Sequence, residues 1–401
     1  MAALSAANAT DNNDNEVVIP EGSKVSMTAY EMYNLKDVTI RIDGTLFATS
    51  DNWKEWPNRG GRIALLQFNG CDGLHITGKG TIDGRGFMWW MREWFQKNLD
   101  GGRPYLIKLS DCTNFEIDGL MVKNSPYYHI VTSDSEEGYF HDMEIYVDIW
   151  GQMDLHKLFN STIKQSFLGM EERMFGMPND LTFPLPTFPL NTDGVDIWGR
   201  NMVFRRMKIT NFDDAIVPKP SNKGKKIHCT ENILVEDIES VFTVGMTIGS
   251  VPPNDNTACI RNVTFRNIYM DKPLKGIYVK SNPGDHGDGI IADITYENFV
   301  MKFPVWWAVY IGPQQQKQPG GAGPGCMIYP INNDCPTNPR ITMENITLRN
   351  ITSTGGLLPA GILRCNSTNP CKNFTFEDVS IKGALWDLLN IGWITEYVEG
   401  T

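Results

Sequence analysis

Apolar residues recur along the chain in a seven-residue pattern that usually begins with Asn or Asp. The second and fourth residues of each copy are apolar, and so is the seventh except in the copy from Gly73, where it is Lys79. The copies are NFEIDGL from Asn114, NMVFRRM from Asn201, NILVEDI from Asn232, NVTFRNI from Asn262, DITYENF from Asp293, NITLRNI from Asn345, NFTFEDV from Asn373 and a weaker GLHITGK from Gly73. The second and fourth side chains share one face of a strand, because side chains alternate along a strand. The shift to the seventh position indicates a bend, after which a new strand points inward.

The spacing of the copies predicts a solenoid. The starts at 201, 232, 262 and 293 lie 31, 30 and 31 residues apart. Helix-length patterns with a 3.6-residue period are nearly absent, which disfavours helical repeats. A unit of three or four short strands cannot bury its apolar face alone, so it must stack on copies of itself. We therefore expect an all-β fold, a single-domain right-handed parallel β-helix with Asn or Asp aligned at the coil corners.

The wider gaps between copies, 114 to 201 and 293 to 345, can hold extra coils or long loops. Their Pro-rich pieces, MPNDLTFPLPTFPL and GPQQQKQPGGAGPG, favour loops. We expect an N-terminal lead-in and cap over residues 1–37, the β-helix over 38–385 and a C-terminal tail over 386–401.

Charge and hydropathy narrow the choice of partner. The 401 residues carry a net charge of −11, which argues against nucleic acid or an anionic membrane as the main partner. A local basic patch could still bind an acidic polymer. No apolar run reaches the ~18 residues of a membrane-spanning helix, so no membrane span is expected.

The cysteines and the glycosylation sequons favour a secreted glycoprotein. The chain has eight cysteines and no C-x-x-C pair, so a zinc-finger interpretation has no support. Seven N-x-[S/T] sequons occur, at Asn8, Asn160, Asn262, Asn345, Asn350, Asn366 and Asn373. Together they modestly favour an extracellular protein.

The cysteine positions fit the repeat register. Cys71 and Cys112 each precede the start of their heptamer by two residues, and Cys229 and Cys259 by three. Stacked strands lie about 4.8 Å apart, within the Cα separation that a disulfide tolerates. We therefore predict the disulfides Cys71–Cys112 and Cys229–Cys259, with Cys326–Cys335 and Cys365–Cys371 in loops. Free buried thiols are the alternative.

Four segments that fall on successive coils carry the candidate chemistry. They are NTDGVDIW at 191, FDDAIVPK at 212, TVGMTIGS at 243 and KGIYVKS at 275. Each is a polar or glycine-containing corner followed by a short apolar strand. Superposing them places Asp193, Asp213 and Asp214 on one face with Tyr278 and Lys280. A face of stacked strands is a natural groove for an extended polymer.

Three carboxylates in one groove suit glycoside hydrolysis. One must be protonated to donate to the leaving oxygen, and another must be ionised to activate water. Repulsion among close carboxylates provides that difference by raising one pKa. An inverting enzyme separates acid and base by roughly 6.5–9.5 Å. Two alternatives remain open at this point: a solvated turn, and a calcium site of the kind that would suggest a β-helical polysaccharide lyase.

These motifs resemble the polygalacturonase family, glycoside hydrolase family 28. NTDGVDIWG, NFDDAIVPK, VGMTIGS and GIYVKS are similar to that family in order and spacing, as are GKGTIDGRGFMWW, NSPYYHIV and CNSTNPCKNFTFEDV. The similarity runs from roughly residue 38 to 385, which makes the β-helix the expected catalytic domain. The resemblance implies an inverting hydrolase without metal or cofactor, secreted and acting on pectin.

The resemblance also assigns roles to individual residues. Asp213 matches the general acid, and Asp193 and Asp214 match the pair that holds and deprotonates the attacking water. Asn191 matches a residue near the substrate. Lys280 matches a lysine that contacts uronate carboxylates, and a cation suits an acidic sugar.

Two positions depart from the family pattern. Thr243-Val244-Gly245 stands where the family has Gly-His-Gly, and Tyr278-Val279-Lys280 stands where it has Arg-Ile-Lys. Tyr278 can stack on a sugar or donate a hydrogen bond, but it cannot form the bidentate carboxylate pair of an arginine. Rhamnogalacturonan hydrolases of the family also lack the His and the Arg, although they tend to have Asp-Glu where this chain has Asp213-Asp214.

Two further residues are candidate polymer contacts. Lys219 continues the strand that follows Asp214, and His129 either reaches the groove or is a structural histidine. The leading hypothesis is a secreted, monomeric inverting hydrolase of α-linked galacturonosyl bonds in pectin. A rhamnogalacturonan hydrolase with the same mechanism and a non-catalytic pectin-binding relative are the alternatives.

Overall fold

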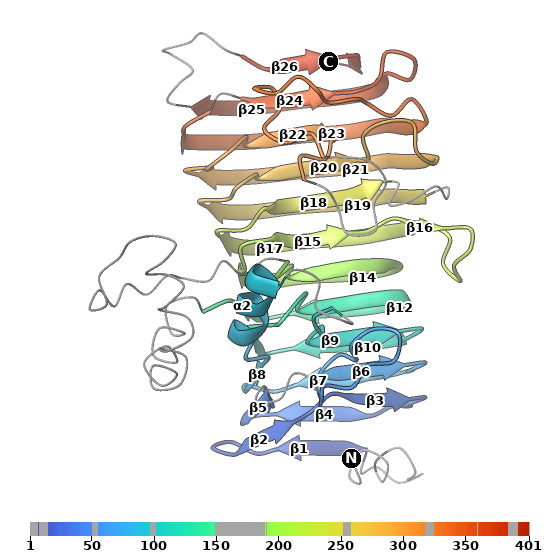
Figure 1. Cartoon of the computed structure of the whole chain (residues 1–401), viewed down its shortest axis with the longest axis vertical. Coiled ribbons are helices and arrows are strands. Elements are labelled where there is room, and N and C mark those ends of the chain that lie inside the picture. Colours follow the sequence, from blue (N-terminus) through green and yellow to red (C-terminus); the bar gives the residue numbers. More distant parts are fainter. Residues whose placement is uncertain are drawn as a thin grey trace.

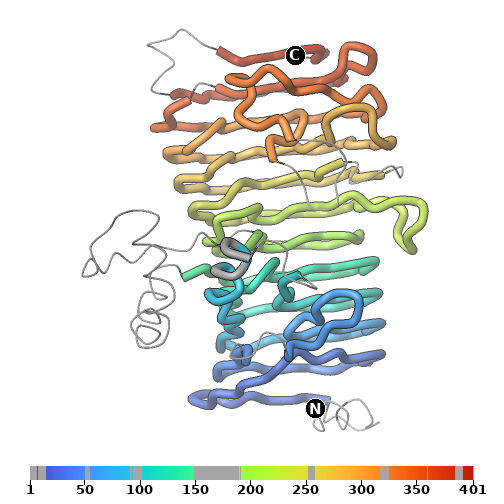
Figure 2. Tube along the Cα trace, viewed as in Figure 1, coloured from blue at the N-terminus to red at the C-terminus, as the bar shows by residue number. Residues whose placement is uncertain are grey.

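The chain folds into a column of stacked parallel strands (Figures 1 and 2). The structure is a computed structural model that describes residues 7, 15–49, 55–96, 102–148, 189, 191–251, 258–316, 325–358, 360–383 and 392–400. Within these residues, every pairing between named strands is parallel except that of β16 with β19. The fold is a right-handed parallel β-helix, and the predicted fold class is confirmed.

The described residues form 27 strands and the helix α2 (Phe87–Gln96). The strands are β1 (Glu16–Ile19), β2 (Lys24–Met27), β3 (Tyr30–Tyr33), β4 (Thr39–Ile42), β5 (Thr45–Ala48), β6 (Leu66–Asn69), β7 (His75–Thr77), β8 (Thr81–Asp83), β9 (Ile107–Ser110), β10 (Thr113–Asp118), β11 (Met121–Lys123), β12 (Ile130–His141), β13 (Glu144–Tyr146), β14 (Val195–Thr210), β15 (Asp214–Pro218), β16 (Ser221–Asn222), β17 (Thr230–Val241), β18 (Gly245–Val251), β19 (Ala258–Asp271), β20 (Ile277–Ser281), β21 (Gly289–Lys302), β22 (Val309–Pro313), β23 (Ile341–Gly356), β24 (Gly361–Arg364), β25 (Cys371–Gly383), β26 (Ile394–Glu396) and β27 (Val398–Gly400). Strands therefore join the column on both sides of the interval 38–385.

One continuous stack of strands runs along the column and carries the candidate site. It consists of β3, β6, β9, the start of β12, the start of β14, β15, β18, β20, β22, β24 and β26, each paired in parallel with the next. We call it the β15 stack. Every residue of β15, β18, β20 and β22 is buried. Strands buried on both faces are typical of parallel sheets that other structure covers.

The corners of the coils are residues with left-handed backbone conformation. The first residue of each heptamer that begins with Asn or Asp has φ between 49° and 57°; these residues are Asn114, Asn201, Asn232, Asn262, Asp293, Asn345 and Asn373. Asn and Asp adopt this conformation more readily than other residues with a Cβ. A second left-handed corner stands at the sixth position, as at Asp237 (57°) and Asn267 (56°). It produces the bend that the shift of apolar residues to the seventh position predicts.

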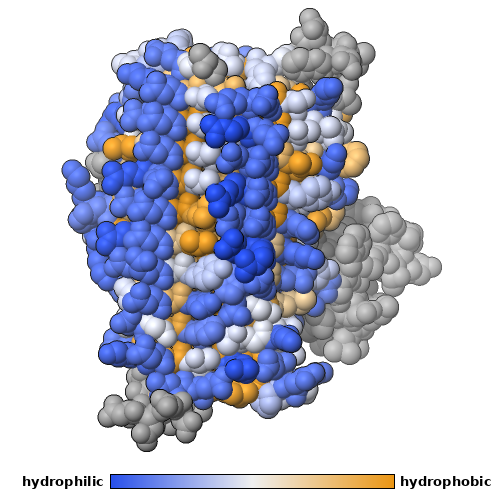
Figure 3. All heavy atoms as spheres, turned by 180° about the vertical axis from the view of Figure 1, so that it is seen from behind, coloured by the Kyte–Doolittle hydropathy of each residue, from blue (hydrophilic) through white to orange (hydrophobic). Residues whose placement is uncertain are grey.

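Hydrogen bonds between corner asparagines link successive coils. Asn232 Nδ2 donates to Asn201 Oδ1 (2.7 Å), and Asn262 Nδ2 donates to Asn232 Oδ1 (2.7 Å). Asn345 continues the ladder to Asp293 (2.8 Å), and Asn373 to Asn345 (3.1 Å). From behind, hydrophilic residues form stripes along the column beside narrow apolar stripes (Figure 3). The asparagine alignment expected from the repeat is thus confirmed.

The core is a column of stacked apolar side chains from the heptamers. In β19, Val263, Phe265 and Ile268 occupy the second, fourth and seventh positions, and all are buried. Rings stack from coil to coil, as Phe265 does on Tyr296 of β21 with 5.0 Å between their centroids. Burying large apolar side chains contributes about 1.5–3 kcal/mol each, so coil stacking itself is the main source of stability.

Three of the four predicted disulfides are confirmed. Cys229–Cys259, Cys326–Cys335 and Cys365–Cys371 are bonded, with Cα atoms 4.7, 4.8 and 5.8 Å apart. The first joins neighbouring coils, as the repeat register predicts.

The predicted Cys71–Cys112 disulfide is wrong, because the structure contains both residues as free, buried thiols. The register does bring them together, since Asp72 pairs with Thr113 and Thr113 N donates to Cys71 O (2.8 Å). Both side chains, however, pack into the core, where Cys112 Sγ donates to the carbonyl oxygens of Phe68 (3.9 Å) and Ser110 (3.5 Å). A buried free cysteine behaves as a small apolar residue.

Candidate active site

Three aspartates meet where β14 and β15 begin. Asp193 lies just before β14, and Asp213 and Asp214 lie at the start of β15 on the next coil. Gly194 N donates to Asp214 O (2.8 Å), which aligns the two corners. Each aspartate offers a carboxylate oxygen within 4.8 Å of the other two. The repeat register therefore predicted this cluster correctly.

Asp213 is a carboxyl group suited to carry a proton. Burial, followed by the nearby charges of Asp193 and Asp214, raises the pKa of Asp213 to about 8. Its Oδ1 accepts from the backbone N of Asp214 (2.9 Å) and its Oδ2 from the backbone N of Asn191 (3.0 Å). Two backbone donors thus fix the orientation of a carboxyl group that is protonated at neutral pH.

Asp214 is held in the ionised form. Burial opposes its ionisation, but Lys280 and then Lys219 outweigh that effect, so the pKa of Asp214 is lowered. Lys280 Nζ donates to Asp214 Oδ2 and Thr247 Oγ1 donates to Asp214 Oδ1, both at 2.6 Å. The site therefore contains a protonated and an ionised carboxyl group side by side.

Lys219 bridges three carboxylates. Its Nζ lies 3.5 Å from Asp193 Oδ2, 3.2 Å from Asp196 Oδ2 and 3.9 Å from Asp214 Oδ2. Burial, followed by the charge of Asp196, raises the pKa of Asp193 well above its usual value. Among the described residues, Asp193 Oδ1 is buried without a hydrogen-bond partner. That oxygen is an open acceptor inside the cluster.

Asp196 is a fourth carboxylate that the sequence interpretation missed. It is fully buried, and burial raises its pKa to about 6. The signal was present, because strand alternation in NTDGVDIW puts Asp196 on the face opposite Val195 and Ile197, which are core residues.

Three residues expected to contact a polymer are buried. Tyr278 and His129 are 0% exposed and Lys280 is 1% exposed. His129 Nε2 accepts from the backbone N of Ser125 (3.3 Å), and its Nδ1 donates to the carbonyl oxygen of Asp193 (3.1 Å). Burial lowers the pKa of His129 to about 4, so the ring is neutral. His129 is thus the structural histidine of the two alternatives, and it positions Asp193.

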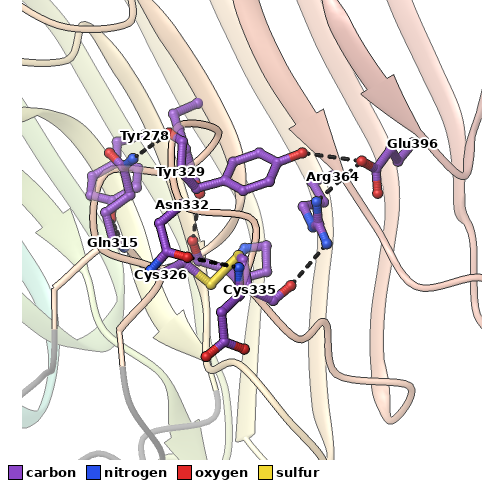
Figure 4. Close-up of a disulfide and its surroundings, with 11 residues drawn as sticks. Tyr278, Gln315, Cys326, Tyr329, Asn332, Cys335, Arg364 and Glu396 are labelled. Carbon is purple, nitrogen blue, oxygen red and sulfur yellow. Dashed lines mark hydrogen bonds and ion pairs between the residues drawn. A yellow bond between two sulfur atoms is a disulfide. The ribbon is translucent and has the colours of Figure 1, made fainter.

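Tyr278 holds a loop instead of facing the groove. Its hydroxyl accepts from the backbone N of Gln315 (3.1 Å) and donates to Gln316 Oε1 (3.3 Å). Gln315 also donates from Nε2 to Tyr329 O (3.1 Å), beside the Cys326–Cys335 disulfide (Figure 4). A loop anchored in this way covers Tyr278.

A wall of tyrosines flanks the cluster, and sequence reasoning missed most of it. Tyr127 and Tyr128 stack with centroids 4.0 Å apart, and Tyr105 stacks on both at 5.4 and 5.5 Å. Arg103 lies 4.6 Å over the Tyr127 ring and donates from Nη2 to Asn191 Oδ1 (2.8 Å). Asn191, whose backbone N binds Asp213, is therefore held from the far side by a buried arginine.

The three clustered carboxylates could in principle hold a cation, but two ammonium groups already occupy their neighbourhood. Lys280 and Lys219 lie 2.6 and 3.9 Å from the same oxygen of Asp214. A hard divalent cation prefers a shell of oxygens, and two adjacent ammonium groups would repel it. The donor set therefore does not fit a metal site.

The chain is similar in sequence to a rhamnogalacturonase and to a polygalacturonase. Rhamnogalacturonase A of Aspergillus aculeatus is 22% identical over 383 residues, covering 94% of this chain and 68% of that protein. A polygalacturonase of Cryptomeria japonica is 25% identical over 355 residues, covering 86% of this chain and 55% of that protein. The chain thus spans little more than half the length of the second relative.

Solved structures with the same fold include an endo-xylogalacturonan hydrolase and a polygalacturonase. The endo-xylogalacturonan hydrolase of Aspergillus tubingensis superposes with a TM-score of 0.69 at 21% identity, covering 96% of this chain and 88% of that one. A polygalacturonase of Erwinia carotovora ssp. carotovora superposes with a TM-score of 0.70 at 20% identity, covering 100% of this chain and 93% of that one.

No helix among the described residues is long and apolar enough to cross a membrane.

Residues 9–395 match the sequence profile described as Glycosyl hydrolases family 28. That span covers nearly the whole column and all four segments that carry the candidate chemistry. The chain therefore belongs to glycosyl hydrolase family 28.

Proposed function

We propose that this protein hydrolyses α-linked galacturonosyl bonds of a pectic polysaccharide by single displacement with inversion. The observation that carries the proposal is the pairing of Asp213, whose pKa is raised to about 8, with Asp214, whose pKa is lowered, within 4.8 Å. Two carboxyl groups with opposite shifts form the acid and base pair of glycoside hydrolysis. The pectic substrate rests on the names of the relatives.

In this mechanism, Asp213 donates its proton to the glycosidic oxygen as the bond from the anomeric carbon to that oxygen breaks. A water molecule between Asp193 and Asp214 attacks the anomeric carbon from the opposite face. Asp214 accepts the proton of that water, and the leaving sugar departs as an alcohol. The open Oδ1 of Asp193 supplies the second acceptor that orients the water.

The short distance between the carboxylates bears on whether the reaction inverts or retains the anomeric configuration. The 4.8 Å limit is below the roughly 6.5–9.5 Å of most inverting enzymes and close to the roughly 5–5.5 Å of retaining ones. Two features support inversion. Both oxygens of Asp214 already accept hydrogen bonds, which weakens it as a nucleophile, and Asp193 offers an unpaired acceptor for water.

The stereochemistry and the substrate are tested in one experiment. Wild type and Asp213→Asn are incubated with polygalacturonate, rhamnogalacturonan, xylogalacturonan and a neutral glycan, and new reducing ends are counted. Proton NMR of the first product gives its anomeric configuration. Release of β-anomer from an α-linked polymer supports inversion, and release of α-anomer contradicts it. Binding without cleavage of any polymer would favour a non-catalytic protein, and an unsaturated product that depends on calcium would establish a lyase.

A rhamnogalacturonan hydrolase is the second candidate. The first relative described above carries that name and matches 94% of this chain. Val244 and Tyr278, which stand where the family pattern has His and Arg, lie together in an apolar cluster, so this corner lacks those two cationic side chains. Preferential cleavage of rhamnogalacturonan in the same panel would select it.

Location and assembly are part of the proposal. The three disulfides support an extracellular protein, because disulfides persist in oxidising compartments. A monomer is expected, because coils stack on one another without a partner subunit.

A further inference from the structure

One corner of the β15 stack lines up three residues on successive coils. Val244 N donates to Asp213 O (2.7 Å), and Lys275 N donates to Val244 O (2.8 Å). Because neighbouring strands lie about 4.8 Å apart, the backbone of Lys275 is roughly 10 Å from that of the acid Asp213. It lies on the side away from Asp193, since β14, β15, β18 and β20 follow one another in that order.

Lys275 is a buried cation without a counter-ion. It is 3% exposed, and its ammonium makes no hydrogen bond or ion pair with any residue that the structure describes. Its ammonium lies over the face of Tyr278, whose ring centroid is 4.3 Å from Nζ. Burial, followed by the charge of Lys280, lowers the pKa of Lys275 to about 7. Burying a charge without a partner is costly, so proteins rarely retain one without a use.

The other two buried lysines of the site already have partners. Lys280 is bonded to Asp214, and Lys219 lies among Asp193, Asp196 and Asp214. Each of these two ammonium groups therefore already has carboxylates beside it that offset its charge. Lys275 is therefore the lysine of this corner whose charge is available to bind an added anion. Asp213 and Asp214 are close enough to influence its pKa.

We propose that Lys275 is a specificity-determining residue that binds the carboxylate of an acidic sugar ring, on the side of Asp213 away from Asp193. The proposal rests on the proposed function, because it requires an acidic polysaccharide across Asp213. Val244 stands between the two on the intervening coil. The assignment moves carboxylate recognition from Lys280, where the family resemblance puts it, to a lysine five residues earlier.

The test compares one polymer in charged and uncharged form. The acidic polymer that wild type cleaves best, and the same polymer with its carboxyl groups methyl-esterified, are given to wild type, Lys275→Met and Lys275→Arg. Lys272→Met is the matched control, because Lys272 is in the same corner but is 47% exposed and bonded to Asp271 (2.6 Å). Initial rates at several substrate concentrations separate kcat from KM.

A contact to a charged group is worth roughly a 10- to 100-fold change in kcat/KM. We expect Lys275→Met to lose that factor on the acidic polymer, mainly through KM, and to change little on the ester. Lys275→Arg should keep most of the preference for the acid, and Lys272→Met should behave as wild type. Equal losses on both polymers, or no loss, would overturn the proposal.

We expect Lys275→Met to fold, because methionine replaces an unpaired charge with an apolar chain of similar length. Thermal melting verifies this, and Lys275→Gln serves as a second variant if Lys275→Met does not fold. The outcomes also separate the two proposals. Wild type that cleaves no acidic polymer rejects the proposed function, whereas active wild type with an unchanged Lys275→Met rejects the role of Lys275 alone.

Discussion

Lys280 donates a hydrogen bond from Nζ to Oδ2 of Asp214 over 2.6 Å, and both side chains are about 99% buried. The two residues come from β20 and β15, which are separated by one strand of the β15 stack. An ion pair in this setting keeps a carboxylate charged where burial alone would neutralise it. In the proposed mechanism, Lys280 therefore acts on the reaction through Asp214.

Replacing Lys280 by Met should shift the acid limb of activity. Asp214 must be ionised, so activity is lost as the pH falls through its pKa. Without Lys280 that pKa rises, and the acid limb of kcat should move to higher pH by roughly one to three units. Removing one partner of a buried pair should also lower the free energy of unfolding by about 3–5 kcal/mol. A pH–rate profile with the exposed Lys223→Met as control measures the shift, and an unmoved acid limb would contradict this role.

Asp213 should set the alkaline limb. It must be protonated, so activity should fall as the pH rises through about 8, the value to which burial raises its pKa. Asp213→Asn removes the proton donor and should lower kcat by roughly 10²–10⁴-fold, with the alkaline limb absent from the residual rate. A substrate with a good leaving group, such as an aryl galacturonide, should be less affected. Asp111→Asn is a matched control, because Asp111 is an exposed corner residue with φ of 54°. Activity of Asp213→Asn within two-fold of wild type would exclude the assignment.

Tyr278→Phe should affect stability more than binding. The change leaves the buried backbone N of Gln315 without its acceptor, which should cost about 1–3 kcal/mol. Because Tyr278 is fully buried, kcat/KM on the acidic polymer should change far less than in Lys275→Met. Chemical denaturation and steady-state kinetics together test this, with the exposed Tyr269→Phe as control. A large rise in KM at unchanged stability would show instead that Tyr278 contacts the sugar.

Corner asparagines should stabilise the fold in two separable ways. Asn232 adopts φ of 57° and makes hydrogen bonds to the asparagines of both neighbouring coils. Asn232→Ala loses the bonds and forces alanine into a left-handed conformation, at about 1–2 kcal/mol for the backbone alone. Asn232→Gly keeps the backbone freedom and loses only the bonds. Unfolding free energies should therefore fall more for Ala than for Gly, and equal losses would assign the whole effect to the ladder.

The repeat made the fold predictable, and it also misled. Spacing of 30 or 31 residues between heptamers fixes coil length, so strands, corners and the Cys229–Cys259 bridge could be placed without coordinates. The same repeat places Asn at the corner and Thr two residues later in NVT, NIT and NFT. The sequons at Asn262, Asn345 and Asn373 therefore follow from coil geometry, and they are weaker evidence for glycosylation than their number suggested.

The site was predictable as far as it depends on the register. Asp193, Asp213 and Asp214 were placed together because they sit at equivalent corners of adjacent coils. Tyr278 and Lys280 were on the expected strand, but their burial depends on the 314–316 loop and on Asp214, which lie far away in the sequence. The stack of Tyr105 on Tyr127, and the reach of Arg103 to Asn191, likewise depend on side-chain packing between coils. The spacing of residues along the sequence does not predict such contacts.

Because the coils are evenly spaced, positions along the proposed polymer-binding face of the β15 stack are also evenly spaced. Every contact along the β15 stack, from Asp213 through Val244 to Lys275, is displaced from the last by one strand spacing of about 4.8 Å. Gain or loss of a whole coil beyond Lys275 would lengthen or shorten this face by one strand spacing and would leave the carboxylate cluster unchanged. In evolution, the length of polymer that such a protein binds can therefore change while the cleavage chemistry at the carboxylates stays the same.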